Sequence, residues 1–467
     1  MKIKEGKSNH KKDFFSSWKN KVILGILILT FSSLTACTSP GYPMPPRTRT
    51  PTNIEDAGGI YAATWISVET GFESDFEPGD ISSFALQADG SLWAWGANES
   101  GQLGNGRTTG WSEFIIQPVQ VRILDDVLSA SAGSEHTLAI QSNGSLWSWG
   151  SNVYGQLGDD TVDQRRMSPD RVMDNVVAAS AGGVHSLAIQ SDGSLWSWGS
   201  NAHGQLGDAT KEQQFNPVLI MDDVVAVSAG YLHSMAITLD GYLWAWGSNS
   251  RGQLGNGNTI DWESPIQIMD DVVEVSAGND HTLAITSDGS LWSWGSNRSG
   301  QLGDGTTEDR HRPVRIMDDV IAISAGYRHS AAVRSDGSLW VWGSNANDQL
   351  GNNGGHRPKP TWIMDDVVAV SAGQSNTLAI SSDGSLWFWG RDWIGQSGDD
   401  IYFVYSSNFG FALLMIFVFL FAIAIVPPMA VVVIVRLVKW RRRKNMQPFK
   451  KPYSVNYRKI REGFLDN

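Results

Sequence analysis

Histidines recur along this chain at a nearly constant interval, and imidazole is well suited to binding a metal ion or moving a proton near neutral pH. Each follows a Ser-Ala-Gly tripeptide by three residues, and a sixth copy carries asparagine: His136, His185, His233, His281, His329 and Asn376. Because each belongs to a separate repeat, these side chains are held apart and cannot converge on one metal. We expect each histidine to form a structural hydrogen bond within its own repeat.

Pairs of aspartates recur shortly before the same tripeptides: Asp125-Asp126, Asp222-Asp223, Asp270-Asp271, Asp318-Asp319 and Asp365-Asp366. Carboxylates gathered on one rim could attract cations, yet their spacing matches no calcium-binding loop. Aspartate is also a common turn residue. We therefore expect turns at these pairs, with no metal site and no cofactor.

The chain contains no arrangement typical of a catalytic site. It has no Ser-His-Asp context, no Gly-x-Ser-x-Gly elbow, no metal-ligand spacing and no phosphate loop. We predict that it is not an enzyme. One alternative stays open, a cell-surface enzyme of the glycosidase or lyase type that uses carboxylates in its loops. Two acids about 5 to 9 Å apart in a substrate cleft would favour that alternative.

Tandem repeats position these residues, and a Trp-x-Trp-Gly motif marks each repeat. The motif ends at Gly96, Gly150, Gly199, Gly247, Gly295, Gly343 and Gly390, with gaps of 54, 49, 48, 48, 48 and 47 residues. A period near fifty residues indicates one supersecondary unit copied in tandem. The two tryptophans of a motif share one face of a strand, and we expect them to pack between neighbouring units.

A typical unit contains four short apolar runs separated by turn residues. From Val224 these are residues 224–228, 234–238, 243–246 and 266–268, with Asp240-Gly241 as a hairpin signal and Pro265 opening the last run. Four antiparallel strands per unit, repeated radially, describe a blade of a β-propeller. The sequence therefore predicts an all-β, seven-bladed propeller over residues 51–400.

The ends of the repeat array suggest how the ring closes. No proline-led fourth strand follows Gly390, whereas residues 51–56 have the spacing of such a strand. We expect residues near 51 to 55 to supply the outer strand of the last blade, so that strands from both ends of the chain share one blade. Residues 61–64 then correspond to a first inner strand, and roughly Trp65 to Ile81 form an inserted acidic loop.

The segment Ser276 to Thr306 preserves a long signature, Ser-Ala-Gly-x-x-His-Thr-Leu-Ala-Ile, then Asp-Gly-Ser-Leu-Trp-x-Trp-Gly and Gly-Gln-Leu-Gly. It resembles the repeat of the regulator of chromosome condensation family, also called alpha-tubulin-suppressor-like repeats. The resemblance implies a seven-bladed propeller; the family includes a GTPase exchange factor, a plant UV-B receptor and a secreted bacterial β-lactamase inhibitor. Gly326 to Ser330 lacks the tryptophan of the receptor motif, which argues against photoreception. The chain is similar to a bacterial, exported, membrane-anchored member.

The two ends of the chain predict export and membrane anchoring. Residues 1–37 form a basic, then apolar export signal that ends in a lipobox-like Leu-Thr-Ala-Cys, with Cys37 as the lipidation site and the only cysteine. A Pro/Thr-rich spacer follows at 38–50. Residues 401–435 hold a juxtamembrane segment and one C-terminal transmembrane helix, and 436–467 form a short basic cytoplasmic tail. We expect the propeller on the extracytoplasmic face of the cell membrane; an uncleaved signal anchor is the alternative to lipidation.

Charge is strongly segregated between the repeats and the ends of the chain. Residues 1–37 and 401–467 carry 18 of the 36 Lys and Arg and only four acids, which leaves a net charge of −26 on residues 38–400. Such a surface repels phosphate backbones, so we expect no nucleic-acid partner. Cationic peptides, basic patches on an unknown protein, or divalent ions are the more natural partners.

The loops after Gly-Gln-Leu-Gly differ most between repeats, and repeat proteins carry binding specificity in such loops. Aromatic residues in or near them are candidate anchors for a partner: Trp111, Phe114, Phe215, Trp262 and Trp393. The sequence thus favours a binding scaffold or inhibitor.

Overall fold

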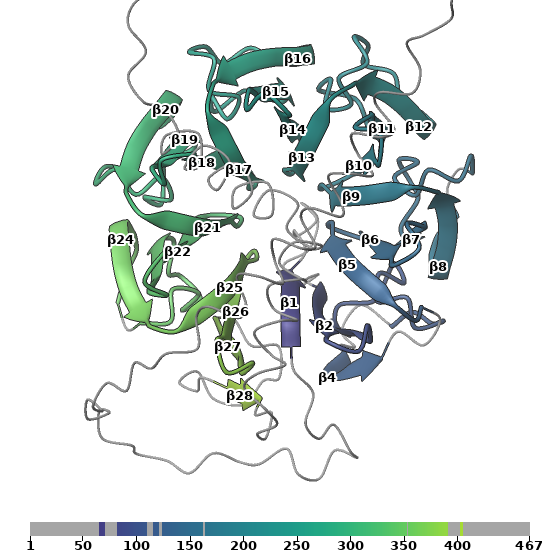
Figure 1. Cartoon of the computed structure of the whole chain (residues 1–467), viewed down its shortest axis with the longest axis horizontal. Helices are drawn as coiled ribbons and strands as arrows, with labels where there is room; N and C mark the ends of the chain where they lie inside the picture. Colours follow the sequence, from purple (N-terminus) through teal and green to yellow (C-terminus); the bar gives the residue numbers. More distant parts are fainter. Residues whose placement is uncertain are drawn as a thin grey trace, which may run out of the picture. The chain divides into compact units, whose positions relative to one another are not determined.

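The computed structural model describes residues 65–70, 82–109, 115–120, 124–161, 164–352, 354–390 and 402–404. All of them belong to one compact unit. The strands of this unit pair into seven four-stranded antiparallel sheets, each made of four strands consecutive in sequence. Figure 1 shows the sheets arranged radially, with the first strand of each sheet nearest the centre. The predicted all-β propeller is therefore confirmed.

Each sheet has an inner strand, two middle strands and an outer strand. The inner strands are β1 (Trp65–Thr70), β5 (Val127–Ala132), β9 (Val176–Ala181), β13 (Val224–Ala229), β17 (Val272–Ala277), β21 (Val320–Ala325) and β25 (Val367–Ala372). The second strands are β2 (Ser82–Gln87), β6 (His136–Gln141), β10 (His185–Gln190), β14 (His233–Thr238), β18 (His281–Thr286), β22 (His329–Arg334) and β26 (Asn376–Ser381).

The third strands carry the Trp-x-Trp-Gly motif: β3 (Leu92–Gly96), β7 (Leu146–Gly150), β11 (Leu195–Gly199), β15 (Leu243–Gly247), β19 (Leu291–Gly295), β23 (Leu339–Gly343) and β27 (Leu386–Gly390). The outer strands are β4 (Ile115–Gln120), β8 (Arg166–Met173), β12 (Gln214–Met221), β16 (Trp262–Met269), β20 (Arg310–Met317), β24 (Arg357–Met364) and β28 (Tyr402–Val404). In six sheets the outer strand has six to eight residues, and in the last it has three. We number the sheets 1 to 7 in chain order.

Turn chemistry sets the ends of these strands. The second residue of each aspartate pair has a positive φ, for example 61° at Asp223 and 63° at Asp271, a backbone region that aspartate tolerates better than most residues. The turns expected at these pairs are thus confirmed. Pro265 does not open its strand, because β16 begins three residues earlier. It lies where the pairing of β16 with β15 is irregular, opposite the stretch between Ala245 and Gly247. Proline is tolerated at such an irregularity.

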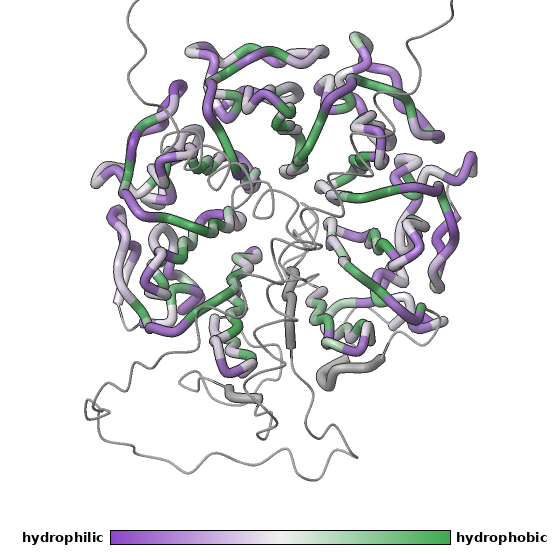
Figure 2. The backbone as a smooth tube through the Cα atoms, in the orientation of Figure 1, coloured by the Kyte–Doolittle hydropathy of each residue, from purple (hydrophilic) through white to green (hydrophobic). Residues whose placement is uncertain are grey.

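Neighbouring sheets are held together by apolar clusters, and each cluster contains side chains from two adjacent sheets. One cluster joins Leu243 and Leu254 of sheet 4 to Val272 and Trp294 of sheet 5, with Trp292 packed against it. Trp294 is fully buried, whereas Trp292 is partly buried. Both tryptophans of the motif therefore pack against the preceding sheet, as predicted. Figure 2 shows the hydrophobic colour along the inner strands and a more hydrophilic periphery.

Ring closure differs from the sequence prediction. The outer strand of sheet 7 is β28, which pairs with β27, so the expected sharing of one blade by both ends of the chain is wrong. Instead β1 lies against β25 and β26. Ala85 of sheet 1 packs in one cluster with Leu378 and Ile380 of sheet 7. Residues 51–55 lie outside the described residues, and β28 falls just beyond residue 400.

The first inner strand is also placed differently. Trp65–Thr70 (β1) pairs with β2, so the segment expected to be an insertion begins with the inner strand of sheet 1; residues 61–64 lie outside the described part. The first strand lacks the Ser-Ala-Gly tripeptide that marks the others, which is why the pattern misplaced it. Within the described ranges no helix has the length and apolar character needed to cross a bilayer. The predicted juxtamembrane segment and transmembrane helix, 401–435, lie outside those ranges except for β28, which falls in the juxtamembrane part.

Candidate functional site: the loop face of the propeller

An up-and-down sheet places its connections alternately at its two ends. The loops after the inner strands and after the Trp-x-Trp-Gly strands lie at one end, which we call the loop face. The Asp-Gly hairpins and the aspartate-pair turns lie at the other end, the hairpin face. Backbone hydrogen bonds join the connections of each end, for example Ser151 N–H to Glu135 O on the loop face and Leu239 N–H to Asp223 O on the hairpin face.

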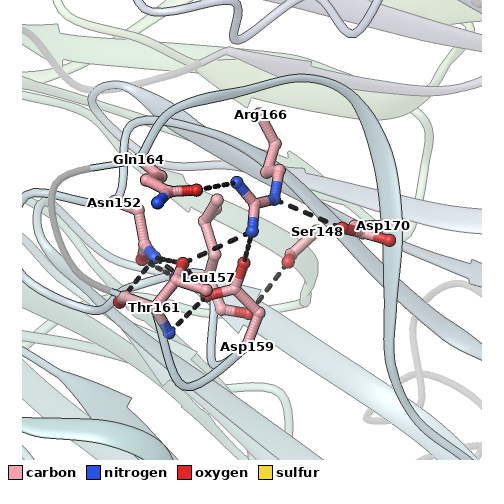
Figure 3. A network of polar contacts seen from close by, with 8 residues as sticks. All are labelled: Ser148, Asn152, Leu157, Asp159, Thr161, Gln164, Arg166 and Asp170. Atoms are coloured by element: carbon pink, nitrogen blue, oxygen red, sulfur yellow. Dashed lines mark hydrogen bonds and ion pairs between the residues drawn. The ribbon is translucent and has the colours of Figure 1, made fainter.

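In the described parts of the long loops of sheets 1 to 6, an asparagine side chain bridges the two ends of the loop through hydrogen bonds. In sheet 2, Asn152 donates to Asp159 at 2.9 Å and to the Thr161 carbonyl at 3.0 Å, and its own Oδ1 accepts the Leu157 N–H. Figure 3 shows this network, in which Arg166 closes the loop through an ion pair of 2.8 Å with Asp159. The network orders the described part of this loop, residues 151–161 and 164–166, and such preorganisation lowers the entropy cost of recognition.

The loops of sheets 3 and 5 are closed by the same position at the start of the outer strand. Gln214 donates to Asp208 at 3.0 Å, and Arg310 donates to Asp304 at 2.8 Å. Burial alone would raise the pKa of Asp208, but hydrogen bonds from Thr210, Asn201 and Gln214 outweigh it and hold that pKa below its ordinary value. These carboxylates are therefore charged parts of the scaffold at neutral pH.

Sheet 4 departs from this pattern. Trp262 pairs with Gly247 where Arg166 pairs with Gly150 and Arg310 with Gly295. Asn256 replaces the loop aspartate, and the Trp262 indole forms no hydrogen bond with any residue the structure describes. Its side chain is 39% exposed. The position that closes the loop in sheets 2, 3 and 5 is here occupied by a solvent-facing aromatic residue.

Further apolar side chains are exposed in or beside the loop-face connections of sheets 2 and 4. Ile260 is 68% exposed, and Val153, Tyr154 and Met167 in sheet 2 are also exposed. Phe215 is half-buried, because one part of its ring packs against Gly155 of the preceding sheet. A Cβ added at Gly155 would come within 2.7 Å of this ring. Sheets 2, 3 and 4 thus each present at least one apolar side chain on the loop face that is not fully buried.

Of the aromatic residues predicted as anchors, the structure describes two. Trp262 and Phe215 lie on the loop face, and Phe215 also serves to pack sheet 3 against sheet 2. Trp111, Phe114, Trp393 and Cys37 lie outside the described residues. Ile260 and Tyr154 were not singled out from the sequence. They could have been found there, because each is an apolar or aromatic residue at a loop position where other repeats have polar residues.

The five recurring histidines lie in the seams between sheets, not within single sheets as predicted. His136 Nε2 lies 2.9 Å from Ser186 Oγ of the next sheet, and Ser186 donates to the Gln156 carbonyl at 2.8 Å. The hydroxyl is thus already a donor, so Nε2 must carry the ring proton. The same contact recurs at the other four: His185–Ser234, His233–Thr282, His281–Ser330 and His329–Thr377.

Burial keeps these histidines neutral. It lowers the pKa of His136, His185, His233 and His281 to about 3 and that of His329 to about 4. Nδ1 of each ring has no hydrogen-bond partner among the described residues. The rings therefore have neither the exposure nor the pKa for acid–base chemistry near neutral pH. Within the described ranges no three His, Cys, Asp or Glu side chains are grouped to hold a metal ion.

One carboxyl group is buried in a seam as well. Glu274 on β17 accepts the N–H of Ile323 in sheet 6 at 3.1 Å, and its second oxygen has no partner among the described residues. Burial raises the pKa of Glu274 to about 8. The corresponding positions in other inner strands are serine or alanine.

With this geometry established, sequence comparison identifies the family. A profile described as RCC1-like domain matches residues 171–409, which is half of the chain. Profiles of the Regulator of chromosome condensation (RCC1) repeat match residues 89–140, 143–189 and 127–156. The chain belongs to the RCC1 repeat family.

Relatives within the RCC1 family are recognised over short stretches. The RCC2 homolog of Danio rerio is 35% identical over 89 residues, covering 19% of this chain and 17% of that protein. The ultraviolet-B receptor UVR8 of Arabidopsis thaliana is 37% identical over 101 residues, covering 21% of this chain and 22% of the receptor. The matched stretches thus span about a fifth of each relative.

A solved RCC1 structure shares the fold. Prp20p of Saccharomyces cerevisiae, described with its binding properties to Gsp1p and histones, aligns with a TM-score of 0.59 at 23% identity. The alignment covers 75% of this chain and 87% of Prp20p. At this identity the likeness concerns the fold alone.

Proposed function

We propose that this RCC1-repeat propeller is a scaffold that binds a protein or peptide partner through its loop face. The observation that carries the proposal is Trp262, the exposed first residue of β16, at a position that closes the loop in sheets 2, 3 and 5. Tryptophan is enriched among the residues that dominate binding energy at interfaces. Prp20p, a propeller of the same family, has described binding properties to other proteins.

The neighbourhood of Trp262 suits a protein partner. Asp261 contacts His203 at 2.9 Å, and Lys211 lies 3.5 Å from Glu263 Oε1. Polar side chains that pair with one another beside apolar ones resemble the polar rim around a binding hot spot. The enzyme alternative receives no support from Glu274, because this carboxyl group is buried in a seam and bonded to the next sheet.

A matched pair of variants tests the loop face. Asn256→Asp with Trp262→Arg rebuilds the Asp304–Arg310 pair of sheet 5, so the loop should stay closed while the exposed indole is lost. Trp362→Arg is the control. Trp362 is an exposed tryptophan on an outer strand that donates a hydrogen bond to Asp365, and Arg315 at the equivalent position of sheet 5 donates to Asp318 in the same way, so arginine should be tolerated there. We expect the double variant to lose at least tenfold in affinity for a partner captured by crosslinking in the native cells, and the control to retain it. Equal binding by both variants would contradict the proposal.

We also propose that the ring is exported and anchored to the cell membrane. The support is the basic and apolar N-terminal segment ending at Cys37 and the uncharged run of residues 409–435 followed by basic residues. Residues 38–400 contain two lysines, Lys211 and Lys359, both on the exposed surface.

A membrane-impermeant amine reagent tests this placement on intact cells. Lys211 and Lys359 should be labelled without permeabilisation, whereas Lys444 of the basic tail should be labelled only after it. Mass spectrometry of the labelled peptides reads both outcomes in one sample. Labelling of the ring lysines only after permeabilisation would refute export.

A further inference from the structure

One hairpin turn of the hairpin face differs from its equivalents. In sheets 3, 5, 6 and 7 the turn reads Ser-Asp-Gly-Ser, at residues 191–194, 287–290, 335–338 and 382–385. In sheet 4 the two serines are replaced by Leu239 and Tyr242, of which 69% and 37% are exposed. Nothing in the fold requires these side chains, because the serine-flanked turns have the same positive φ at their glycine and the same backbone hydrogen bond closing the hairpin.

Backbone contacts hold this turn between two aspartate-pair turns. Leu239 N–H donates to the Asp223 carbonyl at 2.8 Å, and the Gly241 carbonyl accepts the Val272 N–H of sheet 5 at 3.0 Å. The Thr238 hydroxyl donates to Asp240 at 2.6 Å. The two apolar side chains therefore project from a fixed support beside Asp222-Asp223 on one side and Asp270-Asp271 on the other.

Among the residues described, no ion pair neutralises four of the carboxylates around this turn, whereas arginines neutralise carboxylates at the turns that follow β8 and β20. Arg171 pairs with Asp174, Arg315 with Asp318, and Arg334 with Asp319 at 3.1 Å. In the described part of the chain, no ion pair involves Asp222, Asp223, Asp240 or Asp270. Two exposed apolar groups thus lie among four carboxylates without counter-charges.

We propose that the Leu239–Tyr242 turn is a docking site for a cationic segment of a partner protein that carries an apolar side chain between its basic residues. Leu239 and Tyr242 would contact the apolar side chain, and the four carboxylates would pair with the flanking lysines or arginines. A second copy of this chain would bring the same carboxylates together, and an anionic lipid surface would be repelled by them. This site lies at the opposite end of the ring from Trp262 and does not depend on the loop-face proposal.

Fluorescence polarisation of a labelled hexapeptide that alternates arginine with leucine tests the site on the purified full chain in detergent. The variant Leu239→Ser with Tyr242→Ser recreates the turn of four other sheets, so its fold should be preserved. We expect it to bind the peptide at least tenfold more weakly than the wild type. The variant Asp222→Asn with Asp270→Asn should also weaken binding and flatten its salt dependence.

Two controls decide between this site and general electrostatic attraction. A peptide that alternates arginine with serine should bind at least tenfold more weakly than the arginine–leucine peptide, and the Asn256→Asp, Trp262→Arg variant should bind the latter as the wild type does. The proposal is overturned if the serine-turn variant binds the arginine–leucine peptide within twofold of the wild type. It is also overturned if the two peptides bind equally, or if the wild type shows dimerisation that the serine-turn variant loses.

Discussion

Acidification from pH 7.5 to pH 5 is expected to destabilise the ring steeply. The five seam histidines have pKa values of about 3 to 4 in the folded chain, below the ordinary value of 6.5. Between these values the unfolded chain binds protons that the folded ring excludes, so stability is retained above pH 6.5 and lost as the pH falls. Each histidine contributes about 2 kcal/mol of destabilisation at pH 5, and five contribute on the order of 10 kcal/mol. Urea unfolding followed by tryptophan fluorescence at each pH measures this loss.

His233→Asn provides the matched control, because the chain itself carries asparagine at this position in sheet 7 (Asn376). The variant loses the contact with Thr282 and should be less stable at pH 7.5 by about 1 kcal/mol. Below pH 6.5 the free energy of unfolding of the variant should fall less steeply than that of the wild type. The difference between the two slopes should be about 1.4 kcal/mol per pH unit, because one titrating histidine is missing. A wild-type chain whose stability is unchanged between pH 7.5 and 5 would show that the histidines are not held neutral in the seams.

Glu274 titrates in the opposite sense within the same experiment. Its folded pKa of about 8 lies above the ordinary 4.5, so its contribution to stability is complete below pH 4.5 and is lost as the pH rises toward 8. Glu274→Gln keeps an acceptor for the Ile323 N–H without the ionisable group. The variant should therefore be more stable than the wild type at pH 7.5 and equal to it near pH 4.5.

Loss of one fully buried tryptophan is the second large effect. Trp294→Ala should lower the free energy of unfolding by about 3 to 5 kcal/mol, because it opens a cavity between sheets 4 and 5. It also removes a hydrogen bond of 2.8 Å from Nε1 to the Gln253 carbonyl. Trp294→Phe keeps most of the packing and should cost less than Trp294→Ala. Urea unfolding at pH 7.5 provides the comparison.

Trp292 in the same motif is the internal control. It is partly buried and donates to Thr286 Oγ1 at 3.3 Å within its own sheet. Trp292→Ala should therefore destabilise the ring clearly less than Trp294→Ala. A larger loss at Trp292 than at Trp294 would mean that the seams are not packed as the structure shows.

Much of the fold could be predicted because each repeat carries its own local signals. The Trp-x-Trp-Gly strands, the Asp-Gly hairpins and the aspartate-pair turns depend on residues near one another in sequence. Because the repeats share one structure, the strands assigned in a unit with clear signals, such as Val224 to Met269, could also be assigned in units with weaker signals.

The remaining features depend on contacts between units, which no single repeat reveals. β28 has three residues and no motif, so its pairing with β27 has no sequence signal. The partner of His136 lies 50 residues away in the next sheet. The exposure of Trp262 becomes clear only when its pairing with Gly247 is compared with that of Arg310 and Gly295. Departures from the repeat, such as Leu239 and Tyr242, were visible in sequence but needed the structure to show their exposure.

Photo-crosslinking from residue 260 tests most directly whether the loop face binds a partner. Ile260 is 68% exposed beside Trp262, and Trp362, which is 51% exposed on an outer strand, serves as the comparison. Each is replaced in turn by p-benzoylphenylalanine in the full chain, expressed at native level in its own cells. We expect a protein adduct of defined mass from position 260 and none from position 362. Adducts from position 362 alone, or none from position 260, would contradict binding through the loop face.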